Sequence, residues 1–237
     1  MREKVKKASS KQLRQSIPPQ SSLLKKSFQV LEYAYESTDS LWKTFAAVKK
    51  KRNPLGVPTH AEQDLLRAIL IFACAGLDSF IKQIFKDAYP MLVKKHEKAA
   101  IALQKYVEKR LVKTAAVEGE TSTYDTKILA TVLLDDSPKD GLIKLLINDV
   151  ISSSMQSHEE IMKAVNYLGI DPAKLLIQPE EIRHIFNARN RIIHEMDIDF
   201  EAWKKRRQHK IPETQKRYTY ILSLGANILL EVDKLLK

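Results

Sequence analysis

One short segment of this chain combines residue types that can act on a phosphate group. Residues 189–194 read Arg-Asn-Arg-Ile-Ile-His, so Arg189 and His194 are five positions apart. A guanidinium binds phosphate oxygens through paired hydrogen bonds, and an imidazole exchanges a proton near neutral pH. The segment therefore predicts a phosphate site that contains a fixed cation and a proton carrier.

Further polar residues continue this site along the same predicted helix. With the spacing i, i+4, i+7, i+11, four of them form one narrow strip: Arg183, Asn187, Asn190 and His194. The two asparagines add amide donors beside the cation and the histidine. A solvated histidine on an ordinary surface strip has the same spacing, so the pattern alone leaves both interpretations open.

The strip borders an apolar stripe that predicts a buried helix face. The members have the spacing of an amphipathic helix, and they are Ile182, Ile185, Phe186, Ile192, Ile193 and Met196. At about 100° per residue, Arg189 falls near the middle of this stripe. A guanidinium keeps its charge, so its burial requires an ion-pair partner, an escape of the charged end to solvent, or a function. Asp78, on an apolar face of an earlier helix, is a candidate partner for Arg189 or for Arg67.

The rest of the sequence predicts a single all-α domain that positions this helix. The chain has 237 residues, 44% of them hydrophobic, and six glycines, while long stretches rich in Lys, Glu, Leu, Ala and Ile favour helices. We assign residues 1–22 to a basic flexible tail and residues 23–237 to the domain, with the motif helix at about 179–197. The other helices are expected near residues 23–50, 59–88, 138–154, 157–169 and 213–236, with a charged helix that ends near 114. No alternating pattern typical of a strand is present.

Several helix boundaries have local signals. Thr59 and Glu62 form a predicted capping box, and the Ser157-His158-Glu159-Glu160 sequence predicts a second one. Ser137 is expected to cap the helix that begins at residue 138. Pro90 is expected to end or kink the helix that opens at Thr59.

Charge and cysteine content limit the partners and the compartment. The net charge of +11, with basic clusters at residues 4–7, 49–52 and 204–207, favours RNA, DNA or an acidic partner. The single cysteine, Cys74, excludes a disulfide framework and a thiolate metal cluster, and it favours a reducing cytoplasmic location. The longest apolar run, residues 68–77, has about half the length needed to cross a bilayer, so no membrane partner is expected. The glycines are isolated and the histidines lack zinc-site spacing, so neither a cofactor nor a metal is expected.

Residues 189–194 resemble the Arg-x4–6-His signature of the HEPN superfamily, the higher eukaryote and prokaryote nucleotide-binding domains. An asparagine directly after the arginine is a common form of that signature. Residues 64–80 and 152–170 are similar to helices of the bacterial branch that includes the RiboL-PSP-type and defence-associated families. Residues 190–197 resemble that branch's motif and its acidic follow-on, and the whole resemblance spans roughly residues 59–236.

The resemblance implies a fold and an activity. The fold is an up-and-down helical bundle that forms a homodimer, with the two motif helices facing each other. Many members are metal-independent endoribonucleases, often toxins in toxin–antitoxin, abortive-infection or anti-phage systems, and others only bind RNA or nucleotides. In this chain His194 then acts as general base or acid when a ribose 2′-hydroxyl attacks the neighbouring phosphate, and Arg189 binds that phosphate. Asn190 orients His194 or the phosphate, and the product is a 2′,3′-cyclic phosphate.

Further residues of the sequence are expected to support this site. We expect Asp78, Asn187 and Arg183 to support the catalytic residues. We expect a basic run to hold the RNA backbone through charge, namely Lys204, Lys205, Arg206 and Arg207. A solvated basic loop explains the same run. An antitoxin or another defence-system protein is a further expected partner.

Two alternative functions remain open at the level of sequence. One is a HEPN module that holds RNA or a nucleotide without cutting it, and the other is a helical adaptor that docks another protein. The intact Arg-Asn…His arrangement favours the ribonuclease, because an adaptor does not need a histidine at that place.

Overall fold

The computed structural model describes residues 18–52, 56–113, 126–175, 177–201 and 205–237. Most of the predicted basic tail, residues 1–17, lies outside the described residues, and so does Lys204 of the predicted RNA-binding run. The described residues fold into a helical bundle, which confirms the all-α class. One two-stranded hairpin accompanies the helices in this described part of the chain.

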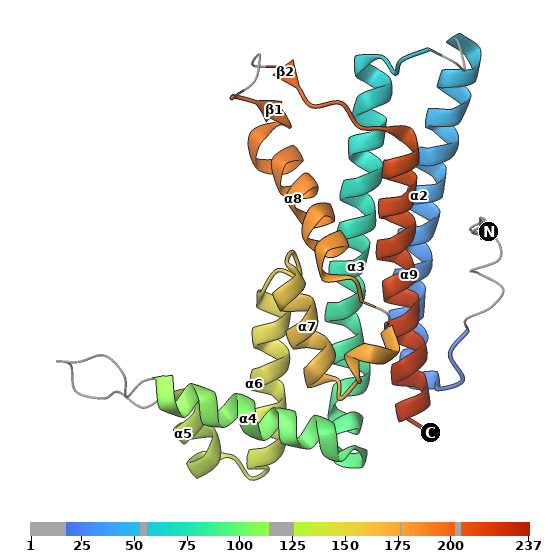
Figure 1. Cartoon of the computed structure of the whole chain (residues 1–237). Coiled ribbons are helices and arrows are strands. Elements are labelled where there is room, and N and C mark those ends of the chain that lie inside the picture. The colour runs from blue at the N-terminus through green and yellow to red at the C-terminus, as the bar shows by residue number, and fades with distance from the viewer. Residues whose placement is uncertain (1–17, 53–55, 114–125, 176, 202–204) are drawn as a thin grey trace.

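Three long helices lie side by side and form the body of the molecule (Figure 1). They are α2 (Lys25–Arg52, preceded by the 3-10 turn η1, Ser22–Leu24), α3 (His60–Lys95) and α9 (Ile211–Leu235). Their apolar faces meet in one core, to which Leu31, Leu77 and Ile228 contribute from the three helices. A Cβ at Gly76 would lie 2.3 Å from the Cβ of Ala34, so α2 and α3 approach so closely that only glycine fits there.

The predicted helix starts are confirmed in part. The backbone N–H of Glu62 donates to the hydroxyl of Thr59 (3.3 Å), and the N–H of Thr59 donates to the Glu62 carboxylate (2.7 Å), which is a complete capping box. Ser157 accepts a hydrogen bond from the N–H of Glu160 (3.1 Å). Ser137 occupies the N-cap position of its helix, but its side chain makes no capping hydrogen bond.

The predicted end of α3 is wrong. The helix was expected to end near Ala88, yet Pro90 lies inside it and it continues to Lys95. Tyr89 and Leu92, on either side of the proline, are fully buried. Packing on both sides therefore holds the helix in spite of the hydrogen bond that proline cannot make.

By length and composition α3 is also the one described helix that could span a membrane, but its apolar face forms the centre of the bundle.

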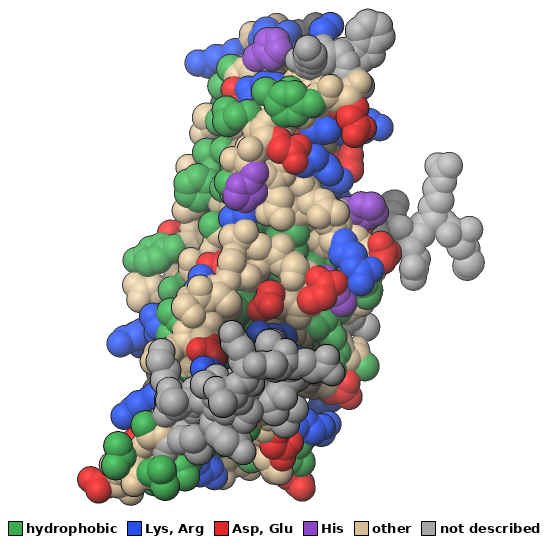
Figure 2. Space-filling view, turned by 90° about the vertical axis from the view of Figure 1, so that its left-hand side faces the viewer, with side chains coloured by type: hydrophobic (Ala, Val, Ile, Leu, Met, Phe, Trp, Pro, Cys, Tyr) green, Lys and Arg blue, Asp and Glu red, His purple; other side chains and the backbone are tan. Residues whose placement is uncertain are grey.

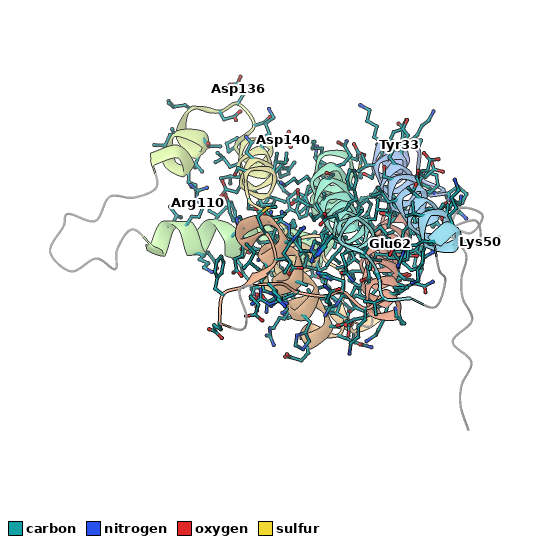
Figure 3. All side chains as sticks on the ribbon, turned by 90° about the horizontal axis from the view of Figure 1, so that it is seen from above. Tyr33, Lys50, Glu62, Arg110, Asp136 and Asp140 are labelled. Atoms are coloured by element: carbon teal, nitrogen blue, oxygen red, sulfur yellow. The ribbon has the colours of Figure 1, made fainter. Side chains whose placement is uncertain are left out.

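A second group of helices packs against one end of α3 (Figure 1). It contains α4 (Glu97–Lys113), α5 (Thr126–Leu134), α6 (Pro138–Ser152) and α7 (His158–Tyr167), followed by the 3-10 turn η2 (Pro172–Leu175). From above, Arg110, Asp136 and Asp140 mark this group on the side opposite to α2, which carries Tyr33 and Lys50 (Figure 3). The sequence pattern did not indicate α5.

The motif helix connects the two groups. It is α8 (Pro179–Glu195), and it leans against α3 and then diverges from it toward the hairpin (Figure 1). The hairpin consists of β1 (Ile198–Asp199) and β2 (Lys205–Arg206), which are antiparallel. Strands of two residues are too short to show an alternating pattern, so the sequence could not indicate them.

Candidate active site

The sequence of α8 explains where this helix begins and ends. Pro179 lies in the first turn, where a missing N–H leaves no hydrogen bond unmade. Glu180 and Glu181 in the first turn and His194 in the last turn match the charges of the helix dipole. The predicted apolar stripe is confirmed along most of the helix, where the buried residues are Ile182, Ile185, Phe186, Ala188 and Ile192.

The stripe becomes exposed toward the C-terminal end of α8. Ile193 and Met196 were predicted to be buried with the rest of the stripe, but they are 39% and 61% exposed. The reason is the divergence of α8 from α3, which leaves this end without a covering helix (Figure 1). Arg189 therefore lies where the covered part of the stripe gives way to the open part.

Arg189 is half-buried between α3 and the turn that joins α6 to α7. Its Nη1 donates to the side-chain oxygen of Gln156 in that turn and to Oδ1 of Asn190 (2.9 Å). Cys74 on α3 lies within the electrostatic influence of the guanidinium. Burial raises the pKa of this thiol to about 12, and the positive charge of Arg189 opposes part of that rise. The predicted catalytic pair of Arg189 and Asn190 is thus in contact, with the amide accepting from the guanidinium.

His194 is exposed on the last turn of α8. Among the described residues its imidazole has no hydrogen-bond partner. Five residues correspond to about 140° around a helix, so Arg189 and His194 point to different sides of α8. In the face that contains α8, hydrophobic side chains lie along one edge with histidines nearby (Figure 2).

The predicted pairing of Asp78 with Arg189 or Arg67 is wrong. Asp78 accepts a hydrogen bond from the backbone N–H of Met155 (2.8 Å) and forms an ion pair with Lys82 (2.9 Å). Its carboxylate therefore holds the α6–α7 turn. This turn carries the side chain that contacts Arg189, so Asp78 is connected to the motif through the turn instead of directly.

Arg183 and Asn187 do not join Arg189 in this structure. Arg183 is exposed and pairs with Glu180 and with Glu159 (3.6 Å). Asn187 is exposed on the same side of α8. The predicted strip is therefore a surface strip, and its Arg183 is already paired with carboxylates.

The end of α8 is held in an unusual backbone conformation. Met196 and Asp197 have φ values of 50° and 59°, a region that residues other than glycine rarely adopt. The N–H groups of both residues donate to the carbonyl of Arg191 and close the helix. Two consecutive left-handed residues are strained, so other contacts must stabilise them.

Those contacts come from a buried cluster of Arg67, Asp197 and His209. One oxygen of Asp197 accepts hydrogen bonds from Nε of Arg67 (2.8 Å) and from Nε2 of His209 (2.7 Å). All three side chains are less than 10% exposed. Burial by itself would raise the pKa of Asp197, but the hydrogen bonds and charges of His209 and Arg67 outweigh it and lower the pKa below its usual value. The cluster thus keeps an ionised carboxylate three residues after His194.

The backbone around His209 is fixed from α3 as well. Gln63 accepts a hydrogen bond from the backbone N–H of His209 (2.8 Å) and donates one to its carbonyl (3.2 Å). Arg67 also donates to the carbonyl of Arg207 (2.6 Å). The sequence analysis missed this cluster, although two signals were present: an arginine on the apolar face of α3, and an aspartate just after the motif helix.

The described part of the predicted RNA-binding run contains one exposed lysine and two arginines that make contacts within the chain. Lys205 is exposed. Arg206 pairs with Asp64 (2.7 Å) and donates to the carbonyl of Met196 (3.1 Å). Arg207 donates to the carbonyl of Ile198 and lies near two carboxylates. The two arginines are thus used to attach the hairpin to the end of α8.

Metal-binding side chains are scattered. Across the described ranges, no group of three or more His, Cys, Asp or Glu residues is arranged to hold a metal ion.

This geometry defines a helical-bundle protein with an arginine, an asparagine and a histidine displayed on one helix. A family model, RiboL-PSP-HEPN, matches residues 36–210. The chain therefore belongs to this HEPN family. The matched span contains α3, the α6–α7 turn, the motif helix and His209. Comparisons with curated proteins and with solved structures give no significant match.

Proposed function

We propose that this protein is a metal-independent endoribonuclease whose site contains Arg189, Asn190 and His194. The single observation that carries the proposal is an exposed imidazole, without a hydrogen-bond partner among the described residues, five residues after a half-buried arginine, in a member of a HEPN family. An exposed imidazole is available to exchange a proton with a substrate. A guanidinium held by neutral oxygens retains its charge for a phosphate.

The reaction follows from these groups. His194 removes the proton from a ribose 2′-hydroxyl, and the 2′-oxygen attacks the adjacent phosphorus. The bond from phosphorus to the 5′-oxygen breaks, and that oxygen takes a proton from water and leaves as a 5′-hydroxyl. Arg189 stabilises the charge that develops on the phosphate oxygens. The products are a 2′,3′-cyclic phosphate and a 5′-hydroxyl end, and DNA is not cut because it lacks the nucleophile.

The proposal includes a homodimer built on the exposed end of the motif helix. Arg189 and His194 point to different sides of α8, so one helix does not bring both groups to one phosphate. A second motif helix facing the first would supply the missing group. Ile193 on α8 and Met196 directly after this helix are exposed apolar residues, and Phe72 on α3 is 49% exposed. Such residues are suited to an interface between subunits.

The dimer is tested by mass in solution. Light scattering during gel filtration is expected to give twice the chain mass for the wild type and a lower mass for Ile193→Asp. Leu133→Asp is the matched control, because Leu133 is 76% exposed on α5, away from the motif helix. A monomeric wild type, or an Ile193→Asp variant that stays dimeric, would contradict this interface.

The activity is tested by incubating a single-stranded RNA with the protein in EDTA. The wild type is expected to release fragments that end in 2′,3′-cyclic phosphate, to leave the DNA of the same sequence intact, and to lose activity in His194→Ala and in Arg189→Ala. His184→Ala is the control, since this histidine is exposed on the same helix, ten residues earlier. Full activity in His194→Ala, or cleavage only with added metal, would overturn the proposal. RNA binding without cleavage would indicate a binding module instead.

A further inference from the structure

We propose that Gln156 is a positioning residue, which fixes the guanidinium of Arg189, and that Asp78 fixes the turn carrying Gln156. This inference rests on the proposed function, in which Arg189 binds the scissile phosphate. Neither residue touches the substrate in this scheme. Both act through Arg189.

The first observation is the contact itself. Gln156 lies 33 residues before Arg189 in the chain, and its side-chain oxygen accepts from Nη1 of the guanidinium. Asn190 accepts from the same Nη1. The two acceptors hold one edge of the guanidinium fork. The other N–H groups, on Nε and Nη2, have no partner among the described residues and remain for phosphate oxygens.

The second observation is that the turn is anchored on both sides of Gln156. The N–H of Met155 donates to Asp78 (2.8 Å), and the Met155 side chain is buried in the core. The N–H of Gln156 donates to the carbonyl of Ser154 (2.9 Å), and Ser157 caps α7. The backbone at Gln156 therefore has little freedom, which reduces the entropy lost when the arginine is ordered.

The third observation is the charge of the acceptor. A carboxylate holds Arg67 elsewhere in this bundle, whereas a neutral amide holds Arg189. A neutral acceptor orients the guanidinium without cancelling its attraction for an anion. A glutamine is therefore the residue type that positions an arginine which must bind phosphate.

The main test measures kcat and KM for cleavage of a short RNA. Gln156→Ala is expected to lower kcat about 10-fold and to raise KM modestly, because the free arginine holds both the bound phosphate and the transition state less well. Gln156→Glu is expected to keep kcat and raise KM about 10-fold, because the added charge repels the RNA. Gln104→Ala is the matched control, since Gln104 is an exposed glutamine on α4 whose side chain donates to the neighbouring Glu108.

A double-mutant cycle separates positioning from a general structural role. If Gln156 acts through Arg189, then Gln156→Ala has no further effect on the residual rate of Arg189→Ala. A structural residue would reduce that residual rate by the same factor as in the wild type. Additive losses, or an increase in activity in Gln156→Ala, would overturn the inference.

The role of Asp78 is tested by two substitutions. Asp78→Asn retains an oxygen that accepts from Met155, so kcat is expected to stay within about 3-fold of the wild type. Asp78→Ala removes the acceptor and is expected to lower kcat as Gln156→Ala does. Lys82→Met breaks only the ion pair of Asp78 and is expected to behave as the wild type. Equal activity of Asp78→Ala and the wild type would overturn this part.

Binding distinguishes this inference from the proposed function. The affinity for a non-cleavable RNA that lacks the reacting 2′-hydroxyl is measured for each variant. If the wild type cuts RNA but Gln156→Ala behaves identically in both assays, only the positioning role fails. If the wild type does not cut RNA, the nuclease proposal fails. Weaker binding of Gln156→Ala, matching that of Arg189→Ala, then still supports a positioned anion site, and unchanged binding rejects it.

Discussion

Two arginines of this bundle lie on predominantly apolar helix faces and are used in different ways. Arg67 on α3 is 3% exposed, and its Nε, Nη1 and Nη2 contact Asp197, Asp64 and the carbonyl of Arg207. Arg189 on α8 is half-buried and contacts only neutral side-chain oxygens among the described residues. The N–H groups of Arg67 are used by hydrogen bonds within the chain. Arg189 has N–H donors and a positive charge that remain available for an anion.

The difference separates a structural arginine from the arginine of the proposed active site. A buried charge is costly unless it is paired and hydrogen-bonded, and Arg67 meets that requirement at the end of α8. The same cluster stabilises the strained residues that follow His194. Arg67 and Asp197 therefore stabilise the end of the motif helix, while the side chains of the proposed active site have no such partners among the described residues.

The largest expected effect is on the rate of cleavage. His194→Ala is expected to lower kcat about 10²–10⁴-fold, because a positioned general base or acid contributes that much. Its free energy of unfolding is expected to change by less than about 0.5 kcal/mol, because the imidazole is exposed. Kinetic assays and urea denaturation check the two numbers. A large loss of stability would mean that His194 belongs with Arg67 in the structural group.

The second expected effect is on stability. Asp197→Ala is expected to lower the free energy of unfolding by about 3–5 kcal/mol, because it leaves buried Arg67 without its carboxylate. Urea denaturation measures this loss, and Asp136→Ala is the control, since Asp136 is exposed in the α5–α6 corner (Figure 3). A loss similar to that of the control would show that the cluster does not hold the end of α8.

The third expected effect is the dependence of stability on pH. The pKa of Asp197 is lower in the folded protein than its value of about 3.9 in an unfolded chain. Its contribution is therefore present above about pH 4 and is lost as the pH falls through the folded pKa. Between about pH 5 and pH 3 the wild type is expected to lose more stability than Asp197→Asn. Parallel curves for the two proteins in thermal melts would contradict this assignment.

A smaller effect is expected for the second arginine. Arg189→Ala is expected to lower the free energy of unfolding by at most about 1 kcal/mol, because its partners are neutral and still reach solvent. The same denaturation experiment on Arg67→Ala provides the comparison, with an expected loss several times larger. If the two losses are equal, the contrast between a structural and a functional arginine is wrong.

The smallest effect is expected at the hairpin. Lys205→Ala is expected to weaken RNA binding slightly. It is also expected to reduce the slope of log Kd against log salt concentration by about one, because one phosphate contact is lost. Arg206→Ala is expected to lower stability instead, because Arg206 pairs with Asp64 and with the end of α8. Binding measured at two salt concentrations distinguishes them. The reverse result would assign the RNA contact to Arg206.

Much of the fold could be predicted because its signals are local. The capping box at Thr59, the proline at the start of α8 and the helical spacing of Ile182, Ile185 and Phe186 each depend on neighbours in the chain. The end of α3 could not be predicted, because packing around Pro90 overrides the local preference. The hairpin and α5 are too short to show a clear period.

The candidate site shows the same difference between local signals and long-range contacts. The residue types and spacing of Arg189, Asn190 and His194 indicated phosphate chemistry, and the matched family range contains all three residues. The sequence did not identify Gln156 as the partner of Arg189, and it assigned Asp78 to the wrong contact. Both contacts join segments far apart in the chain, and no local pattern encodes such a distance.

The sequence by itself determined most of the helices, the motif and its placement on an amphipathic helix, because helical periodicity and capping act within a few residues. Only the tertiary structure decided which charged groups are neutralised and which remain available. Arg67 meets Asp197 and His209 because α3, the end of α8 and the segment after the hairpin converge there. Arg189 meets an amide because the α6–α7 turn is held over α8. The energy of a buried charge depends on such neighbours in space, and these are set by packing.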